Sequence, residues 1–483
     1  MIRVYLDWNI ISNLKKPEFQ EIAQFIQENK DCFQFPYSPA HFHDLMKSYQ
    51  PNNEFFQKDL ESLEYLSEKH LLRWGKDGIE VLFGTPKEYF EGQIEQEDPF
   101  LLMDMEKVLS DIDESTSDIG LGNIGKLMKS LFQLAPSGIE ITDENRDVLN
   151  KMFPNLTPQS SMWDLMKDIA PFSKNLLQDR EYYKDFRNMM AEQGFKLESN
   201  SGNWSKEEVI ENIDTFLSSF KLNMTYLEYV ETTFKHRKEP ANAYEFYTTA
   251  YLMLDMIGFR RDKLPKPTDN MQNIQADAEH SFYGGYCDYF IADDRNLRIK
   301  TEILYNEFNI PTPVLEPSEL ISTLSKVLHQ PNENTNILTE ALSFCKEKAI
   351  VEHYPISDEN ELETTAYKLP IFYFNFFNYV IFTQYPKQEV LTLTFKRVFK
   401  NYSTFIYYTE SERLIDRIVK LFGFDDKEEL AQKKQDFVYS DKHVEFVWSF
   451  KGGVIRFEKS EDNSRPELSY IISTRIPEDE SPE

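Results

Sequence analysis

Residues 286–297, YCDYFIADDRNL, contain a short apolar run that ends on two adjacent aspartates, Asp293 and Asp294. The apolar run predicts a buried strand, and the polar and amphipathic residues after it predict a helix. Two carboxylates about 4 Å apart repel each other by roughly 4 kcal/mol at an effective dielectric constant of about 20. We therefore expect either that the two side chains point apart or that positive charge compensates them at the end of this strand.

The N-terminal segment shows a similar arrangement. RVYLD, residues 3–7, predicts a short apolar strand that ends on Asp7, and WNIISNL continues as the start of a helix. A second predicted strand, residues 32–38, leads into a serine and a proline, a favourable N-cap and first residue of a helix. That helix carries Asp44 in its second turn. Strand, helix, strand and helix in succession predict an α/β domain with parallel strands.

The chain divides into three parts. Residues from about 50 to 240 show long, acidic, helical patterns such as FFQKDLESLEYLSEKHLLRW, and we interpret them as a helical insertion. Helices and strands alternate again afterwards, so residues 1–328 are assigned to one α/β domain with a parallel sheet. Aromatic strand patterns and the helix ESERLIDRIVKLFG predict a C-terminal α+β domain with an antiparallel sheet over residues 337–483.

Composition limits the classes of protein that the chain can represent. The formal charge of −29, with 82 acidic and 53 basic residues, disfavours unspecific attachment to nucleic acid or anionic lipid. Three scattered cysteines form neither a disulfide framework nor a zinc-binding pair, which fits a reducing cytoplasm. The start of the chain lacks the features of a signal peptide. The apolar stretch 369–385 is too short and too rich in amides to span a membrane, so we predict buried strand there and a cytoplasmic protein without a membrane segment.

Acids from four separate segments are predicted to converge on one edge of the parallel sheet. The carboxyl ends of neighbouring parallel strands border one crevice. Asp7 and the doubled aspartate end strands, while Asp44 and Asp277 lie near the starts of two helices, Asp277 in the first turn of a predicted helix at 275–286. Carboxylates without cysteine or paired histidine ligands suit Mg²⁺ or Mn²⁺ better than zinc. One or two such cations would neutralise these acids, and ions of this kind can activate a water in phosphodiester hydrolysis.

Taken in order, these motifs resemble those of the PIN-domain nucleases. VYLDWNIISNL matches the first motif of the family, SPAHFHDL the second, ADAEHSFYGGYCDYF the third and YFIADDRNL the fourth. The resemblance covers about residues 1–50 and 240–325, and the second motif here has aspartate where glutamate is commoner. The catalytic and metal-binding residues that it implies are Asp7, Asp44, Asp277 and Asp294, with Asp293 as a neighbouring metal ligand.

The resemblance implies a PIN-like, Rossmann-like domain that acts as a Mg²⁺- or Mn²⁺-dependent nuclease, with RNA favoured over DNA as the substrate. Toxins and defence effectors belong to the same family. The helical insertion or the C-terminal domain would then bind a regulatory partner or form a homo-oligomer. Substrate contacts are expected from Asn9, His280, Arg295 and Arg298, and the further basic residues Arg260, Arg261, Lys263, Lys266 and Lys300 are candidates for holding phosphates.

Each acid also has a structural explanation. Asp7 is placed to cap the helix that follows it, and Asp277 to complement a helix dipole. Asp44 fits a solvated helix position, and one of the doubled aspartates fits a turn. A PIN-like binding or assembly module whose acids no longer hold metal is therefore the alternative function. A phosphatase or nucleotide hydrolase is disfavoured, because the chain has neither a P-loop nor a recognisable aspartyl nucleophile.

Overall fold

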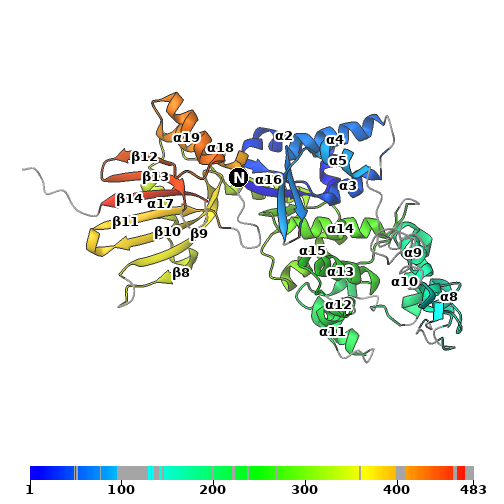
Figure 1. Cartoon of the computed structure of the whole chain (residues 1–483). Helices are drawn as coiled ribbons and strands as arrows, with labels where there is room; N and C mark the ends of the chain where they lie inside the picture. The colour runs from blue at the N-terminus through cyan, green and yellow to red at the C-terminus, as the bar shows by residue number, and fades with distance from the viewer. Residues whose placement is uncertain are drawn as a thin grey trace, which may run out of the picture.

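The protein is described by a computed structural model with a parallel sheet, a helical region and a C-terminal antiparallel sheet (Figure 1). Among its described residues, no helix combines the length and the apolar character needed to cross a membrane. The structure describes residues 1–47, 49, 53–76, 78–94, 129–131, 133–134, 137, 141–143, 146–192, 194–197, 201–219, 224–235, 239–266, 269–357, 361–398, 408–460 and 465–473.

The parallel sheet joins the two ends of the first domain. Its strand order is β2-β1-β5-β6, and every neighbouring pair is parallel. All residues of β1 are buried, as expected for a parallel strand covered on both faces. The predicted α/β domain with parallel strands is therefore confirmed, and its strands are β1 (Ile2–Leu6), β2 (Phe33–Gln34), β5 (Tyr289–Ile291) and β6 (Val314–Leu315).

Two hydrophobic cores cover the two faces of this sheet. Ile2, Val4 and Leu6 belong to one core and Tyr5 to the other, because successive residues of a strand point to opposite faces. The Tyr5 face is therefore covered by a different set of side chains from the Val4 face. The helices that surround the sheet are α1 (Trp8–Asn13), α2 (Gln20–Glu28), α3 (Pro39–Met46), α13 (Ala243–Met256), α14 (Met271–Gly284), α15 (Arg295–Glu307) and α16 (Pro317–Val327).

Helix α14 begins earlier than the sequence suggested. Its N-cap is Asn270, whose side chain accepts a hydrogen bond from the backbone N–H of Gln272 at 3.0 Å. The predicted start at 275 was wrong because this cap signal lies upstream of it. Asp277 consequently lies beyond the first turn, where a helix dipole gives little reason for an acid.

The region between the two halves of the α/β domain is not entirely helical. Helix α4 (Glu54–Ser67) ends at Glu68, which has φ of 57°, and the chain then forms the antiparallel pair β3 (His70–Trp74) and β4 (Ile79–Phe83). The helix predicted through Trp74 was therefore wrong over its last residues. The backbone N–H of Tyr37 donates to the carbonyl of His70 at 2.9 Å, and this bond attaches the hairpin beside the parallel sheet.

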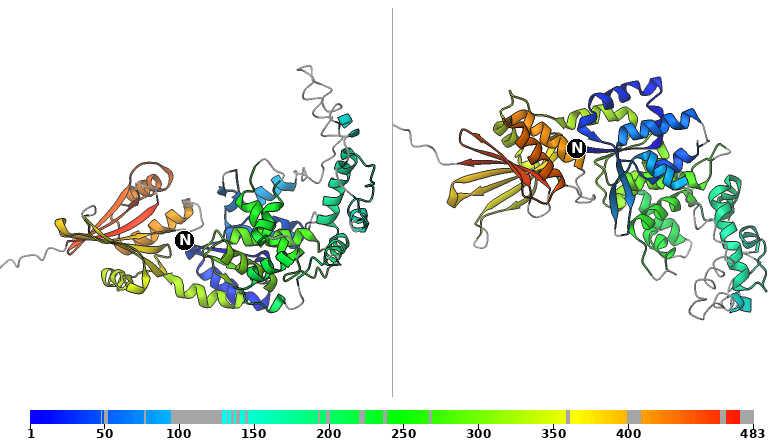
Figure 2. Two further views of the ribbon diagram at one scale, coloured as in Figure 1. Left: turned by 90° about the horizontal axis from the view of Figure 1, so that it is seen from below. Right: turned by 45° about the horizontal axis from the view of Figure 1, so that its top comes forward.

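The remaining described helices of this region agree with the predicted insertion. Figures 1 and 2 show α8, α9 and α10 at the end of the molecule opposite the C-terminal sheet. The buried residues of helices α11 and α12 join the core on the Tyr5 face of the parallel sheet. These elements are α5 (Pro86–Ile94), α8 (Arg146–Met152), α9 (Met162–Gln178), α10 (Arg180–Glu192), α11 (Val209–Ser219) and α12 (Tyr226–Thr232).

The C-terminal part is built on a mostly antiparallel sheet of order β12-β13-β14-β11-β10-β9-β7, with β8 also paired to β9. The apolar stretch at 369–385 forms parts of two strands, because Phe374 and Asn375 turn the chain with positive φ angles of 55° and 52°. One of the predicted aromatic strands, STFIYYT at 403–409, lies outside the described residues up to position 407, and its last two residues belong to helix α18 instead. The strands are β7 (Leu328–His329), β8 (Ile350–Tyr354), β9 (Glu363–Tyr373), β10 (Phe377–Tyr385), β11 (Val390–Lys396), β12 (Glu445–Phe450), β13 (Gly453–Lys459) and β14 (Pro466–Ser473), and the helices are α17 (Ile337–Phe344), α18 (Tyr408–Phe422) and α19 (Lys427–Tyr439).

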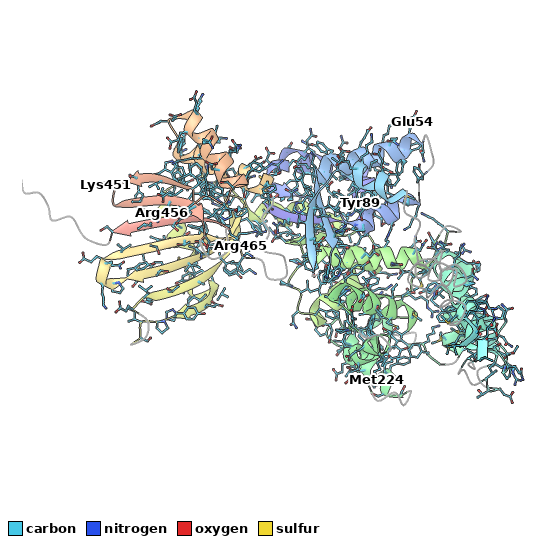
Figure 3. The ribbon with its side chains drawn as sticks, in the orientation of Figure 1. Glu54, Tyr89, Met224, Lys451, Arg456 and Arg465 are labelled. Carbon is cyan, nitrogen blue, oxygen red and sulfur yellow. The ribbon has the colours of Figure 1, made fainter. Side chains whose placement is uncertain are left out.

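Buried charges connect the two sheets. The guanidinium of Arg3 in β1 donates to both carboxylate oxygens of Glu410 in α18, at 3.1 and 2.8 Å, and neither side chain is more than 1% exposed. Arg397, which follows β11, pairs with Asp288 just before β5. Figure 3 shows Arg465 on the side of the C-terminal sheet that faces the α/β domain. Breaking such a pair costs several kcal/mol, so it fixes how the two parts dock.

Candidate metal centre

Three segments bring potential metal ligands together at the carboxyl edge of the parallel sheet. Asp7 follows β1, Asp44 lies in α3 and His280 lies in α14, and one ligand atom from each lies within 4.8 Å of the other two. Ligands of one ion bound at about 2.1 Å are about 3 to 4.3 Å apart. Side-chain shifts of under about 1 Å would therefore bring all three onto a shared cation.

Asp7 has its carboxylate beside the first turn of the helix that it precedes. Its backbone N–H donates to the carbonyl of Ile291 at 2.9 Å, which extends the pairing of β1 and β5. Its side chain makes no well-formed capping hydrogen bond to α1, although the backbone N–H of Asn9 favours the ionised form of Asp7, so capping explains this acid only in part. The amide of Asn9 donates to Asp7 Oδ2 at 3.3 Å, so Asn9 contacts this acid. Burial, with Asp44 adding repulsion and His280 opposing, raises the pKa of Asp7 to about 6.

Asp44 is held as an anion by two neighbours. Its Oδ2 lies 3.0 Å from Nε2 of His280, and its Oδ1 pairs with the ammonium group of Lys47 one turn later in the chain. Burial by itself would raise the pKa of Asp44, but the His280 hydrogen bond and the Lys47 charge outweigh it and hold this pKa well below its usual range. The side chain is only 15% exposed, so a solvated helix position does not describe it. Asp7 and Asp44 thus have opposite pKa shifts within one site.

Asp277 lies beside this group without a partner of its own. Its carboxylate makes no hydrogen bond or ion pair to any residue that the structure describes. Burial and repulsion from four further carboxylates raise its pKa well above the usual value. The largest of these repulsions comes from Asp262, and the others come from Asp7, Asp44 and Asp294. An acid in such surroundings keeps a proton or requires a nearby cation.

The doubled aspartate has a different arrangement from the one expected. Asp294 is the N-cap of α15, and its Oδ1 accepts from the backbone N–H groups of Asn296 and Leu297 at 2.6 and 2.9 Å. Asp293 is exposed, and its backbone carbonyl accepts from Arg298 at 2.7 Å. Solvent around two exposed carboxylates screens their repulsion. Neither belongs to the close ligand group, and the turn-forming explanation fits Asp294.

The basic residues near the edge are mostly occupied by protein groups. Arg298 donates to the carbonyls of Ala292 and Asp293 and pairs with Glu316 at 3.2 Å, so it braces the ends of β5 and β6. Arg295 is exposed at the start of α15. Arg260 and Arg261 donate to backbone carbonyls, those of Gly202 and Arg187, while Lys263 and Lys266 lie in the following loop.

Lys300 was one of the candidates for holding substrate phosphates, and its burial excludes this role. Its ammonium group is fully buried and bonds Asp262 at 3.0 Å and Asp255 at 3.3 Å. Asp255 also binds Arg187 at 2.8 Å. Lys300 also interacts electrostatically with Asp277, so part of the compensating charge for Asp277 is built into the protein.

Sequence reasoning missed several residues of the site. Tyr5 was signalled only by the alternation of β1, which puts it on the opposite face from Val4 and Leu6. Lys47 was signalled by its spacing of three residues from Asp44, which places both on one side of a helix. Asp262 lies in an irregular loop, where no periodic pattern indicates the direction of a side chain.

Comparisons with known proteins assign no family to this chain. No family model, no curated protein and no solved structure matches it. The interpretation of the site consequently depends on the geometry and electrostatics of its own residues.

Proposed function

We propose that the chain is a divalent-metal-dependent nuclease whose α/β part is PIN-like. The observation that carries this proposal is the group of two carboxylates and one imidazole at the carboxyl edge of a parallel sheet, with ligand atoms within 4.8 Å. The carboxylate of Asp277 beside this group, which has no partner in the described part of the chain, supports it. Topology supports it too, since ligands of open α/β sheets bind outside the carboxyl ends of the strands.

The donor set fits a hard or borderline divalent cation such as Mg²⁺ or Mn²⁺. Asp7 and Asp44 would hold the cation, with Asp277 near it. When bound, such a cation stabilises charge on phosphoryl oxygens and activates water for hydrolysis. The pKa values of Asp7 and Asp277 are raised, and a bound cation would favour the ionised form of both carboxyl groups, so its binding should release protons.

Lys47 has two roles in this proposal. In the metal-free protein its ammonium group neutralises Asp44. Once Asp44 serves a cation, Lys47 is available to bind a substrate phosphate, and the exposed Arg295 is a second candidate at the same edge. The formal charge of −29 opposes unspecific attachment to a polyanion, so we expect restricted cutting, with RNA as the favoured substrate.

One observation favours the alternative, an inactive binding or assembly module. Asp44 already has both His280 and Lys47 as partners, so it has no need of a cation to remain charged. The two functions differ in whether a phosphodiester is cut.

Incubation with labelled RNA, single-stranded DNA and duplex DNA in Mn²⁺ or Mg²⁺ tests the proposal. We expect cleavage of at least one substrate by the wild type and loss of cleavage by at least a hundredfold in Asp7→Asn and Asp277→Asn. Asp31→Asn is the matched control, because that carboxylate is 86% exposed in the same domain. Cleavage that persists in Asp7→Asn, or wild-type protein that binds RNA without cutting it, would refute the nuclease assignment.

A further inference from the structure

His280 is the outermost member of a buried hydrogen-bonded chain that the nuclease proposal does not explain. Its Nδ1 lies 2.9 Å from the hydroxyl of Tyr5, and this hydroxyl lies 2.5 Å from Oγ of Ser38. Nδ1 of His41 lies 3.4 Å from both hydroxyl oxygens. His280, Tyr5, Ser38 and His41 are all less than 1% exposed, so water cannot replace a missing partner in this chain.

The inner end of the chain has a fixed direction. Nε2 of His41 lies 2.9 Å from the carbonyl oxygen of Leu6, which can only accept, so this nitrogen carries the proton. Nδ1 of His41 is an acceptor, because the backbone N–H of Ser38 donates to it at 3.1 Å.

The outer end has a direction set by Asp44. Oδ2 of Asp44 lies 3.0 Å from Nε2 of His280 and accepts from it when this nitrogen carries the ring proton. In that tautomer Nδ1 accepts from the hydroxyl of Tyr5, and the hydroxyl of Ser38 donates to Tyr5. A nitrogen that carries a proton cannot bind a metal ion.

The hydroxyl of Tyr5 can work in the opposite direction as well. In the other tautomer of His280, Nε2 has no proton and Nδ1 carries it, so Nδ1 donates to Tyr5 Oη. The Tyr5 hydroxyl then donates to Ser38 Oγ, and the Ser38 hydroxyl turns toward Nδ1 of His41. The ring gives the Nε2 proton to solvent water and takes the Nδ1 proton from solvent water, so its charge is unchanged and Tyr5 and Ser38 keep their own hydroxyl hydrogens. The two hydroxyl hydrogens reorient about their C–O bonds, and every group keeps a partner.

We propose that His280 Nε2 is a nitrogen ligand of the cation, and that the Tyr5 hydroxyl is the positioning group that lets His280 exchange Asp44 for the metal. The inference rests on the proposed function only in that a cation binds beside Asp7 and Asp44. Metal-binding histidines generally have their second ring nitrogen held by a polar partner, which fixes the tautomer and the ring orientation. Tyr5 is held in place by edge contacts to Phe290 and His280, with ring centroids 5.7 Å apart in each case.

A nitrogen ligand changes which cation the site prefers. Oxygen-only sites suit Mg²⁺, whereas imidazole suits first-row transition metals. Two carboxylates and one imidazole therefore favour a divalent ion of the Mn²⁺, Fe²⁺ or Co²⁺ class over Mg²⁺. The earlier expectation of an all-carboxylate site is replaced by this mixed donor set, in which His280 serves the cation rather than the substrate.

Pulsed electron paramagnetic resonance of Mn²⁺ added to the full-length protein tests this inference. We expect modulation from an imidazole ¹⁴N nucleus in the wild type and its loss in His280→Gln. Calorimetric titration should show Mn²⁺ binding weakened about tenfold or more in Tyr5→Phe, the range typical for loss of a hydrogen bond to a metal ligand. Mg²⁺ binding should change less than about threefold. Tyr226→Phe is the matched control, because it removes an equally buried hydroxyl that bonds the carbonyl of Ala250.

The outcomes separate this inference from the nuclease proposal. Mn²⁺ that binds the wild type in an Asp7-dependent way without any ¹⁴N modulation overturns the role of His280 and leaves the nuclease proposal intact. Wild-type protein that binds no divalent cation overturns both. The spectrum of the wild type needs no variant, so an unstable His280→Gln or Tyr5→Phe protein does not affect this result.

Discussion

Replacing Asp7 with asparagine should stabilise the metal-free protein at neutral pH. Asp7 is 1% exposed, and its pKa of about 6 in the folded chain compares with 3.8 in an unperturbed aspartate. The difference is about two pKa units, and each unit corresponds to about 1.4 kcal/mol. Ionised Asp7 therefore costs the folded state about 3 kcal/mol. Asparagine can keep the contact with Asn9 and carries no charge.

The sign of the effect follows from the direction of the pKa shift. An acid with a raised pKa binds its proton more tightly in the folded state, so folding stability falls as pH rises between about 4 and 6. The advantage of Asp7→Asn should be near zero below pH 4, grow across this window, and reach about 3 kcal/mol above pH 6.

Hydrogen exchange of peptides that contain β1, measured through a denaturant series without metal, gives the stability of the α/β part. Asp31→Asn should show no such pH-dependent gain, because that side chain is 86% exposed. Mn²⁺ at a thousand times its Kd should reverse the order of the two proteins, since it stabilises the wild type by about 4.1 kcal/mol, which exceeds the advantage of the variant. An Asp7→Asn protein that is less stable than the wild type at pH 7 without metal would refute the reasoning.

Three further results are expected. Lys47→Gln should bind Mn²⁺ about two to five times more tightly in calorimetry, because the ion pair of Lys47 with Asp44, which competes with the cation, is worth up to about 1 kcal/mol. Weaker Mn²⁺ binding would contradict competition between Lys47 and the cation. Glu410→Gln leaves Arg3 buried without its countercharge and should lose about 3 to 5 kcal/mol in denaturation at pH 7. Arg3 and other nearby charges hold the pKa of Glu410 below its usual value of 4.5 despite burial. The wild type should therefore lose the same stability as pH falls below about 4.5. A stability difference between the two proteins that does not change with pH would exclude the ion pair as its cause. Asp294→Ala should lose about 1 kcal/mol of stability, because the helix cap is removed. Asp294→Asn should keep this stability and change the affinity for Mn²⁺ by less than about threefold. A larger loss of affinity would show that this carboxylate is a metal ligand.

Local patterns in the sequence determined the main divisions of the chain. Short apolar runs predicted β1 and β5, and a serine followed by proline predicted the start of α3 at Pro39, where it is found. These signals succeed because strand and helix periodicities and caps depend on residues close together in the chain. The likeness to PIN-domain nucleases remains a prediction, since it depends on the same short motifs.

The tertiary structure decided which side chains meet. Pairing of β1 with β5 and packing of α14 bring His280 to Tyr5 and Asp44, residues far away in the sequence. No local pattern distinguished Asp294, which caps a helix, from Asp7, which makes no well-formed capping hydrogen bond and enters the ligand group. The physical reason is that hydrogen bonding and charge act over a few ångströms of space, and the sequence alone does not give those distances until the sheet has formed.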